Sequence, residues 1–343
     1  MLTNNEIHEL KLLLTQKKNI VITAHTNPDG DAIGSSLAMY HYLVKLGNTV
    51  NMMVPNQFPD YYAWLPESDK IIIYENKPKF CQKLLKEADI IFSLDYNALS
   101  RLGVLTDIVK NTTGTRILID HHIDPERESF DYCYSNTNTS STGELVYDFI
   151  MKLGDEKIID KKIGEAIYTC IVTDTGSFSF SCNRPDTYII TSKLISLGVD
   201  AEKIHKLIFD TYSENRLRLL GFAISNRMIV WEELHAAIIY LTKSDLNKYK
   251  YKVGDTEGVV NFPLSMGKIN LSILITEKDN KLRISFRSKG SFSVNELSRS
   301  HFSGGGHRNA AGGKSSESID DLLARLKSVI SDNKEQLNYT ISL

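Results

Sequence analysis

The first half of the chain alternates short apolar segments with amphipathic ones. Residues 19–24 (NIVITA) form an apolar, β-branched run that is typical of a buried strand. After a polar loop, apolar positions recur with helical spacing from about Ile33 to Leu46, and Gly47 is a residue that readily ends a helix. The same patterns predict strands at 49–54, 89–94 and 116–119, a helix at 80–87, and a helix that starts at a capping box (141–144) and runs to 153. Continuous apolar strands separated by helices indicate a parallel sheet covered by helices on both faces.

The pattern changes after Ser177. Residues 185–226 are predicted to be mostly helical, with an interruption at Gly198 and Val199. Longer strands are predicted at 227–240, 268–277 and 281–288, followed by a glycine-rich loop at 303–313 and a helix at about 319–331. We therefore expect an α/β fold, in which an N-terminal parallel-sheet domain (1–185) is joined by a helical connector (186–215) to a smaller α+β C-terminal domain (216–343).

Composition narrows the class of protein. The chain has 343 residues, of which 42% are hydrophobic and 24% charged, as in globular proteins with two domains. Its 40 Lys and Arg residues against 42 Asp and Glu residues give a net charge of -2, which argues against binding long duplex nucleic acid by charge alone. The sequence contains no apolar run of about 18 residues and no signal-peptide pattern. Its four cysteines have no paired spacing, so we expect a cytoplasmic protein without a membrane anchor.

Acidic and imidazole side chains gather where the predicted strands end. The strand ends are followed or closed by His25, Asp29, Asp31, Asp95, Asp120, His121 and His122, and Asp174 follows a predicted helix. Because parallel strands point their carboxyl ends to one edge of the sheet, we expect these side chains to meet there. Each of them alone also fits a simpler role, since Asp29 and Asp31 lie in a turn-like segment and Asp174 could merely end a helix. The convergence of four separate segments favours a functional site.

A cluster of this composition predicts bound cations. Closely spaced carboxylates repel one another unless positive charge neutralises them. Oxygen and imidazole donors without cysteine suit Mn²⁺ or Mg²⁺. The ligands outnumber the needs of one ion, and two ions about 3.5–4 Å apart that share a carboxylate are typical of phosphate-ester hydrolysis.

The glycine-rich segment at 303–313 predicts an anion site in the C-terminal domain. Glycines allow backbone N–H groups to approach a phosphate closely. Between residues 281 and 314 there are seven basic residues and a single acidic one, Glu296; the basic residues are Lys281, Arg283, Arg287, Lys289, Arg299, Arg308 and Lys314. A small compound with several phosphate charges is the expected ligand.

Taken together, these motifs resemble the DHH phosphoesterase superfamily. The resemblance is carried by the segment from His25 to Ser35, by Asp95, by residues 120–122 and by residues 174–176. Residues 286–288, Gly304-Gly305-Gly306-His307 and residues 310–312 resemble its DHH-associated C-terminal domain. Within the superfamily, the size and the Gly-Gly-Gly-His motif most resemble the branch of bifunctional oligoribonucleases that also dephosphorylate 3'-phosphoadenosine 5'-phosphate (PAP), the nanoRNase type.

The resemblance implies a role for each matching residue. One ion would be held by His25, Asp29 and Asp95. The other would be held by Asp31, Asp95, His121 and Asp174. Asp120 would orient an imidazole, and His122 would face the substrate. In the C-terminal domain the substrate would be held by Arg287, Gly304, Gly305, Gly306 and His307.

The resemblance also implies an activity. It predicts a phosphoric-ester hydrolase that uses two divalent ions, with Mn²⁺ preferred and Mg²⁺ or Co²⁺ as alternatives. Short RNA oligonucleotides and small phosphorylated nucleotides are the expected partners, and a homodimer is left open. One alternative is a phosphodiesterase for linear or cyclic dinucleotides, and another is a non-catalytic module that binds nucleotides or RNA.

Overall fold

The computed structural model describes residues 2–278 and 281–338, and it divides into two compact units after Thr211. Each unit has a six-stranded sheet of its own. The architecture confirms the predicted fold class, with a parallel-sheet unit, a helical segment and a second unit built on a mixed sheet. Among the helices of the described residues, none combines the length and the apolar composition needed to cross a membrane.

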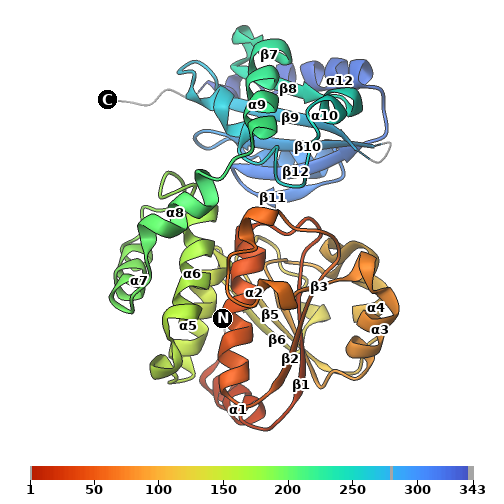
Figure 1. Ribbon diagram of the computed structural model, residues 1–343. Helices are drawn as coiled ribbons and strands as arrows, with labels where there is room; N and C mark the ends of the chain where they lie inside the picture. The colour runs from red at the N-terminus through yellow and green to blue at the C-terminus, as the bar shows by residue number, and fades with distance from the viewer. Residues whose placement is uncertain (1, 279–280, 339–343) are drawn as a thin grey trace. The chain divides into compact units, whose positions relative to one another are not determined.

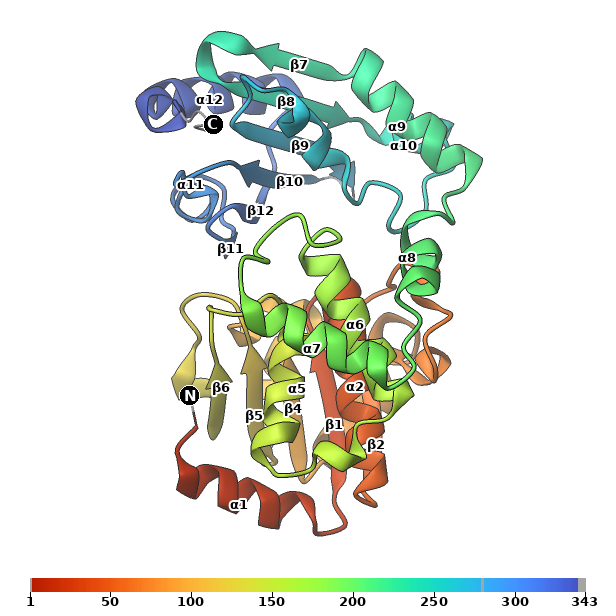
Figure 2. The same ribbon diagram turned by 90° about the vertical axis from the view of Figure 1, so that its left-hand side faces the viewer.

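The sheet of the first unit is entirely parallel (Figures 1 and 2). Its strands are β1 (Asn19–Ala24), β2 (Thr49–Val54), β3 (Ile72–Ile73), β4 (Ile90–Leu94), β5 (Thr115–Asp120) and β6 (Tyr132–Ser135). Their order across the sheet is β3-β2-β1-β4-β5-β6. The chain therefore reverses its direction of winding between β1 and β4, and such a switch point is where open α/β sheets bind ligands.

Helices cover both faces of this sheet (Figure 1). They are α1 (Asn4–Leu14), α2 (Gly30–Lys45), α3 (Pro78–Lys86), α4 (Thr106–Lys110), α5 (Thr142–Lys152), α6 (Lys161–Asp174), α7 (Pro185–Ser196) and α8 (Ala201–Phe209). Along β1, Ile20 and Ile22 pack with α2, α5 and α6, whereas Val21 packs on the other face with α3 and α4. The central strands β1 and β4 are mostly apolar because both of their faces are buried.

The predicted helical segment at 185–226 consists of three helices rather than one interrupted helix. Helices α7 and α8 bury Ile190, Leu194 and Ile204 in the core of the first unit. The predicted interruption at Gly198 separates them, and this glycine has a φ of 91°, which suits the end of a helix. The third helix, α9 (Glu214–Asn226), lies in the second unit.

The second unit has a mixed sheet of order β11-β12-β10-β9-β8-β7. Its strands are β7 (Met228–Trp231), β8 (Ala236–Leu241), β9 (Leu271–Lys278), β10 (Lys281–Ser288), β11 (Gly305–His307) and β12 (Ala310–Ser315). Its other helices are α10 (Lys243–Lys248), α11 (Val294–His301) and α12 (Ile319–Asp332). Alternate strand residues pack against α11 and α12 on one face, and against α9 and α10 on the other.

Two predictions for the second unit were wrong. Residues 227–240 form the antiparallel hairpin β7–β8 instead of one strand, because a 3₁₀ turn (Glu232–Leu234) and the left-handed His235 reverse the chain. The segment 303–313 is largely the hairpin β11–β12 rather than an open loop. Its register pairs Gly305 with Gly312 and His307 with Ala310. Part of the glycine content of this segment is therefore explained by the close approach of the two strands of its own hairpin.

Candidate metal centre

Three neighbouring strands of the first sheet end in residues that bind metals well. His25 follows β1, Asp95 follows β4, and Asp120 closes β5, with His121 and His122 directly after it. Because β1, β4 and β5 are adjacent and parallel, these side chains arise along one edge of the sheet. This edge contains the switch point between β1 and β4.

Helix ends supply the remaining carboxylates. Asp29 caps α2 and accepts hydrogen bonds from the backbone N–H groups of Asp31 and Ala32, each at 3.1 Å. Asp31 itself lies in the first turn of α2, and Asp174 is the last residue of α6, which packs against α2. A carboxylate at the carboxyl end of a helix faces the negative end of the helix dipole. The position of Asp174 is therefore unfavourable unless a positive charge lies nearby.

The first group of possible ligands surrounds His25. Its Nε2 atom lies 3.8 Å from Oδ1 of Asp29 and 3.5 Å from Oδ2 of Asp95. The side chains of His25 and Asp95 are almost fully buried, whereas 45% of the Asp29 side chain is exposed. One side of this group is thus open to solvent.

The second group surrounds His121. Its Nε2 atom lies 3.5 Å from Oδ2 of Asp31, 3.6 Å from Oδ1 of Asp95 and 3.2 Å from Oδ2 of Asp174. Asp95 therefore belongs to both groups, with Oδ2 facing His25 and Oδ1 facing His121. One carboxylate lying between two ligand sets is the arrangement that a pair of bridged ions requires.

The spacing of these atoms fits bound cations better than direct ion pairs. Two donor atoms that each lie about 2.1 Å from one ion, at an angle of about 90–110°, are about 3.0–3.5 Å apart. The observed separations of 3.2–3.8 Å match that range or slightly exceed it. The buried His and Asp cluster therefore fits a divalent metal site.

The charges of the cluster lead to the same conclusion. Burial, and after it the negative charges of Asp95 and Asp174, raise the pKa of Asp31 well above its usual range. Burial alone would lower the pKa of His25, but the carboxylates of Asp29 and Asp95 outweigh it and raise that pKa to about 10. Partial burial acts to raise the pKa of Asp29, yet the His25 ring holds it below its usual value. Carboxylates that destabilise one another in this way are stabilised by a cation.

Asp95 has a backbone conformation that few residues adopt. Its φ of 64° places it in the left-handed region, which Asp and Asn tolerate better than other residues with side chains. Its N–H donates to the carbonyl of Ile119 on β5 at 3.2 Å. Such outliers cost about 1–3 kcal/mol and cluster at functional sites, where the surrounding structure holds them in place.

Asp120 is fully buried and holds His122. One of its carboxylate oxygens lies 2.7 Å from Nδ1 of the His122 ring, and the other accepts a hydrogen bond from the His122 backbone N–H at 3.1 Å. Burial acts to lower the pKa of His122, but the charge of Asp120 reverses this effect and raises it. A ring held through Nδ1 presents Nε2 to its surroundings.

Helix α5 contributes to this site, although no sequence pattern indicated it. The segment 141–144 predicted the start of this helix, and the Ser141 hydroxyl does accept from the Glu144 N–H at 3.1 Å. In a complete capping box the Glu144 carboxylate would also accept from the Ser141 N–H. Among its described contacts, this carboxylate accepts from Ser140 and Thr187 instead. The first two residues of α5, Thr142 and Gly143, donate to the clustered carboxylates.

The predicted substrate residues lie in the second unit. Arg287 on β10 and His307 on β11 both pair with Ala310 of β12, so their side chains project from the same face of the sheet. Added Cβ atoms would overlap the Gly312 carbonyl oxygen at Gly304 and would come within 2.5 Å of the Ala310 carbonyl oxygen at Gly306. Packing explains these two glycines, and their role toward a substrate stays a prediction.

At Gly305 packing gives no such explanation. An added Cβ there would meet nothing closer than 3.8 Å, which is ordinary contact. The absence of a side chain at this position is therefore not required by the fold.

Comparison with known proteins identifies the family. Residues 19–171 match the model of the DHH family, N-terminal domain, and residues 235–332 match that of the DHHA1 domain. The crystal structure of an exopolyphosphatase-related protein from Bacteroides fragilis is 40% identical, covers 98% of both chains and superposes with a TM-score of 0.91. The chain belongs to the DHH family. The predicted resemblance is thereby confirmed.

Relatives within the DHH family are named for more than one activity. The bifunctional oligoribonuclease and PAP phosphatase NrnA of Bacillus subtilis is 25% identical over 95% of this chain and 99% of its own length. The cyclic-di-AMP phosphodiesterase GdpP of the same organism is also 25% identical over 95% of this chain, which spans about half of GdpP (49%). Identity alone therefore does not choose between these substrates.

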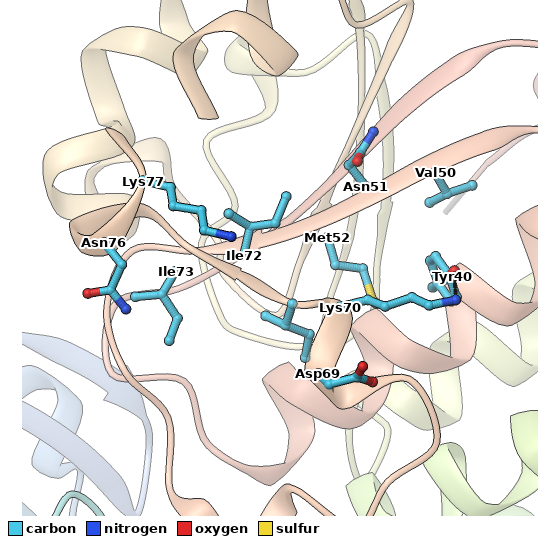
Figure 3. Close-up of a pocket in the computed structure, with 11 residues that line it drawn as sticks. Tyr40, Val50, Asn51, Met52, Asp69, Lys70, Ile72, Ile73, Asn76 and Lys77 are labelled. Carbon is cyan, nitrogen blue, oxygen red and sulfur yellow. Dashed lines mark hydrogen bonds between the residues drawn. The ribbon is translucent and has the colours of Figure 1, made fainter. Parts of the chain in front are cut away.

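A separate pocket lies at the β3 edge of the DHH sheet (Figure 3). It has a volume of about 450 Å³ and is lined by residues of β2, β3 and the adjoining turns, together with Tyr40. None of the carboxylates or imidazoles of the metal site lines it. The Lys70 amine at its rim is already held by Glu67 at 2.6 Å and by the Tyr40 hydroxyl at 3.2 Å. This pocket offers no chemistry comparable to that of the metal site.

Proposed function

We propose that this chain is a two-metal phosphoesterase that degrades very short RNA to mononucleotides and dephosphorylates PAP. The observation that carries the proposal is the pair of ligand groups that share Asp95, because separate carboxylate oxygens serve His25 and His121. The match to NrnA over nearly the whole of both chains supports the choice of substrates.

The interatomic distances support two ligand sets. His25, Asp29 and Asp95 would hold one ion, and the other would be held by Asp31, Asp95, His121 and Asp174. The hard oxygen donors and imidazoles favour Mn²⁺, with Mg²⁺ or Co²⁺ as alternatives. Bound there, the ions would supply Lewis acidity toward a phosphoryl oxygen and would lower the pKa of a water molecule.

The chain's own groups would position the substrate. His122, held by Asp120 through Nδ1, would contact a phosphate oxygen through Nε2. In the second unit, the Arg287 guanidinium can grip a phosphate with two parallel hydrogen bonds, and His307 lies on the same face of that sheet. The backbone at Gly304–Gly306 would add N–H donors, as glycine-rich segments do for phosphates.

A phosphodiesterase acting on linear or cyclic dinucleotides is the second candidate. The equal identity to GdpP favours it, and the same metal site would serve it. A non-catalytic nucleotide-binding module is disfavoured, because binding alone does not explain buried acids that destabilise one another.

A substrate panel tests the proposal. The purified chain is incubated with RNA of two to about ten nucleotides, PAP, a linear dinucleotide and cyclic di-AMP, each with Mn²⁺ and with EDTA. We expect Mn²⁺-dependent release of mononucleotides from the shortest RNA and release of phosphate from PAP. Turnover of cyclic di-AMP alone would favour the second candidate. Binding without any turnover would leave the non-catalytic module.

A further inference from the structure

The first turn of α5 lies directly against the clustered carboxylates. The Thr142 N–H donates to Oδ2 of Asp31 at 2.6 Å, and the Gly143 N–H donates to Oδ1 of the same residue at 2.9 Å. The first N–H groups of a helix have no partners within the helix, so they are suited to bind an anion. Both oxygens of the fully buried Asp31 are thereby fixed, and the Thr142 N–H also acts to lower its pKa.

The side chain of Thr142 reaches a second carboxylate. Its hydroxyl donates to Oδ1 of Asp95 at 2.9 Å, and Thr142 is fully buried. Oδ1 is the oxygen that faces His121, whereas Oδ2 faces His25. The hydroxyl therefore fixes the rotation of the Asp95 carboxylate and decides which oxygen serves which histidine.

The surrounding structure holds this helix start rigidly. Glu144 accepts hydrogen bonds from Ser140 and from the Thr187 hydroxyl of α7, at 2.6 Å and 2.9 Å. An added Cβ at Gly143 would overlap the Cys170 side chain of α6, so α5 and α6 are in close contact there. A helix start fixed from two sides can hold a carboxylate against the repulsion of its neighbours.

We propose that Thr142 is a positioning residue of the metal centre, which sets the Asp95 carboxylate so that its two oxygens can serve two ions. This inference rests on the proposed two-ion site and adds to it a residue outside the ligand sets. Groups that orient metal ligands typically contribute 10–100-fold in metal affinity or activity. The contribution of Thr142 should appear in metal binding as well as in turnover.

The test compares two variants at Thr142 with one at a second buried threonine. Thr142→Val removes the hydroxyl but keeps the shape and the backbone N–H, and Thr142→Ser restores a hydroxyl. Thr169→Val is the matched control, because it removes a buried hydroxyl whose described hydrogen bond goes to the Glu165 carbonyl within α6 and not to a proposed ligand or to the start of α5. Isothermal titration calorimetry with Mn²⁺ gives the stoichiometry and affinity, and thermal unfolding in EDTA reports on folding without metal.

We expect Thr142→Val to weaken Mn²⁺ binding 10–100-fold, Thr142→Ser to stay within about threefold of wild type, and Thr169→Val to bind as wild type does. Equal Mn²⁺ affinity in Thr142→Val and wild type would overturn the positioning role, and so would an equal loss in Thr169→Val. If Thr142→Val does not fold, Thr142→Ala replaces it under the same expectation. Failure of the wild-type chain to bind Mn²⁺ would instead overturn the proposed function.

Discussion

Asp95 combines a left-handed backbone with a carboxylate that faces two histidines. Replacing it by Ala would change both properties, because Ala in the left-handed region adds about 1–2 kcal/mol of strain. Asn tolerates that conformation and keeps the shape of the side chain. Asp95→Asn therefore isolates the loss of the charge that both ions are proposed to share.

We expect Asp95→Asn to fold but to lose at least a hundredfold in turnover. Mn²⁺ should also no longer raise the melting temperature, because the variant lacks the charged carboxylate that the two ions are proposed to share. Turnover at saturating Mn²⁺ and the shift in melting temperature on adding Mn²⁺ are the two measurements. Asp107→Asn, at an exposed position on α4, is the control. Retention of most Mn²⁺-dependent activity in Asp95→Asn would refute the bridging role.

A second single-residue prediction concerns Arg287. Arg287→Lys keeps the positive charge but loses the planar fork of the guanidinium. We expect kcat/KM to fall about tenfold or more, since each lost charge-assisted hydrogen bond is worth about 1.5–3 kcal/mol. His307→Ala, on the same sheet face, should act in the same direction.

Metal content by elemental analysis should stay unchanged in both variants. Arg283→Lys serves as the control, because it lies on β10 four residues from Arg287. Wild-type kinetics for both Arg287→Lys and His307→Ala would remove the substrate-binding role and leave the metal site untouched.

Candidate site residues were easiest to find from the sequence where a suitable side chain stands at the end of a predicted strand. His25, Asp95 and Asp120 could be identified because each closes or follows an apolar run, and the parallel sheet brings those ends to one edge. Thr142 could not be identified in this way. It lies 111 residues from Asp31, and its contacts depend on how α5 packs against α6 rather than on any local pattern.

At the level of elements, β1, β2, β4 and β5 were predictable because apolar residues dominate them and pack into the cores on the two faces of the sheet. The strands β3 and β6 were not predicted, because they are short and only partly buried. The hairpin β7–β8 was not predicted either, because its reversal depends on the 3₁₀ turn Glu232–Leu234 and the left-handed His235, and no glycine or proline marks this turn in the sequence. The hairpin β11–β12 was hidden for a related reason. Its glycines suggest flexibility, whereas several of them are required by close packing of the backbone.

The glycines around β11 give a matched pair of substitutions. Gly304→Ala should destabilise the chain by about 1–3 kcal/mol or more, because its Cβ would overlap the Gly312 carbonyl oxygen. Gly305→Ala should leave stability within about 1 kcal/mol, since its Cβ would meet only ordinary contacts. Thermal unfolding checks both expectations.

The same pair tests the predicted substrate contact. If the backbone at Gly305 approaches a phosphate, Gly305→Ala should raise KM while the melting temperature stays near that of wild type. An unchanged KM would show that Gly305 does not contact the substrate.

At the scale of the whole molecule, the charge of the chain limits how much its affinity for RNA can rise with the length of the RNA. The chain carries a net charge of -2, and its segment 281–314 holds seven basic residues against one acidic residue. Only a few phosphates can be neutralised at once, so a long RNA should bind little better than a di- or trinucleotide.

Salt dependence measures this directly. We expect the logarithm of the affinity for short RNA to fall with the logarithm of salt concentration with a slope shallower than about -3, which corresponds to roughly four contacts on a single strand. Competition binding at several KCl concentrations, with a dinucleotide and a 20-nucleotide RNA in parallel, gives the slopes. A slope that implies six or more contacts, or processive degradation of the longer RNA, would contradict the expectation.

The carboxyl end of α6 lies at the proposed metal site and leads into a segment of unusual backbone conformation. Asp174 stands where a helix normally favours a cation, and the residues that follow include Ser177, Phe178 and Ser181, all with positive φ. A divalent ion at Asp174 would place positive charge at this end of the helix, where it would oppose the helix dipole. The protein would then gain part of its local rigidity from the metal supply of its surroundings, so that metal starvation would loosen this segment as well as stop the reaction.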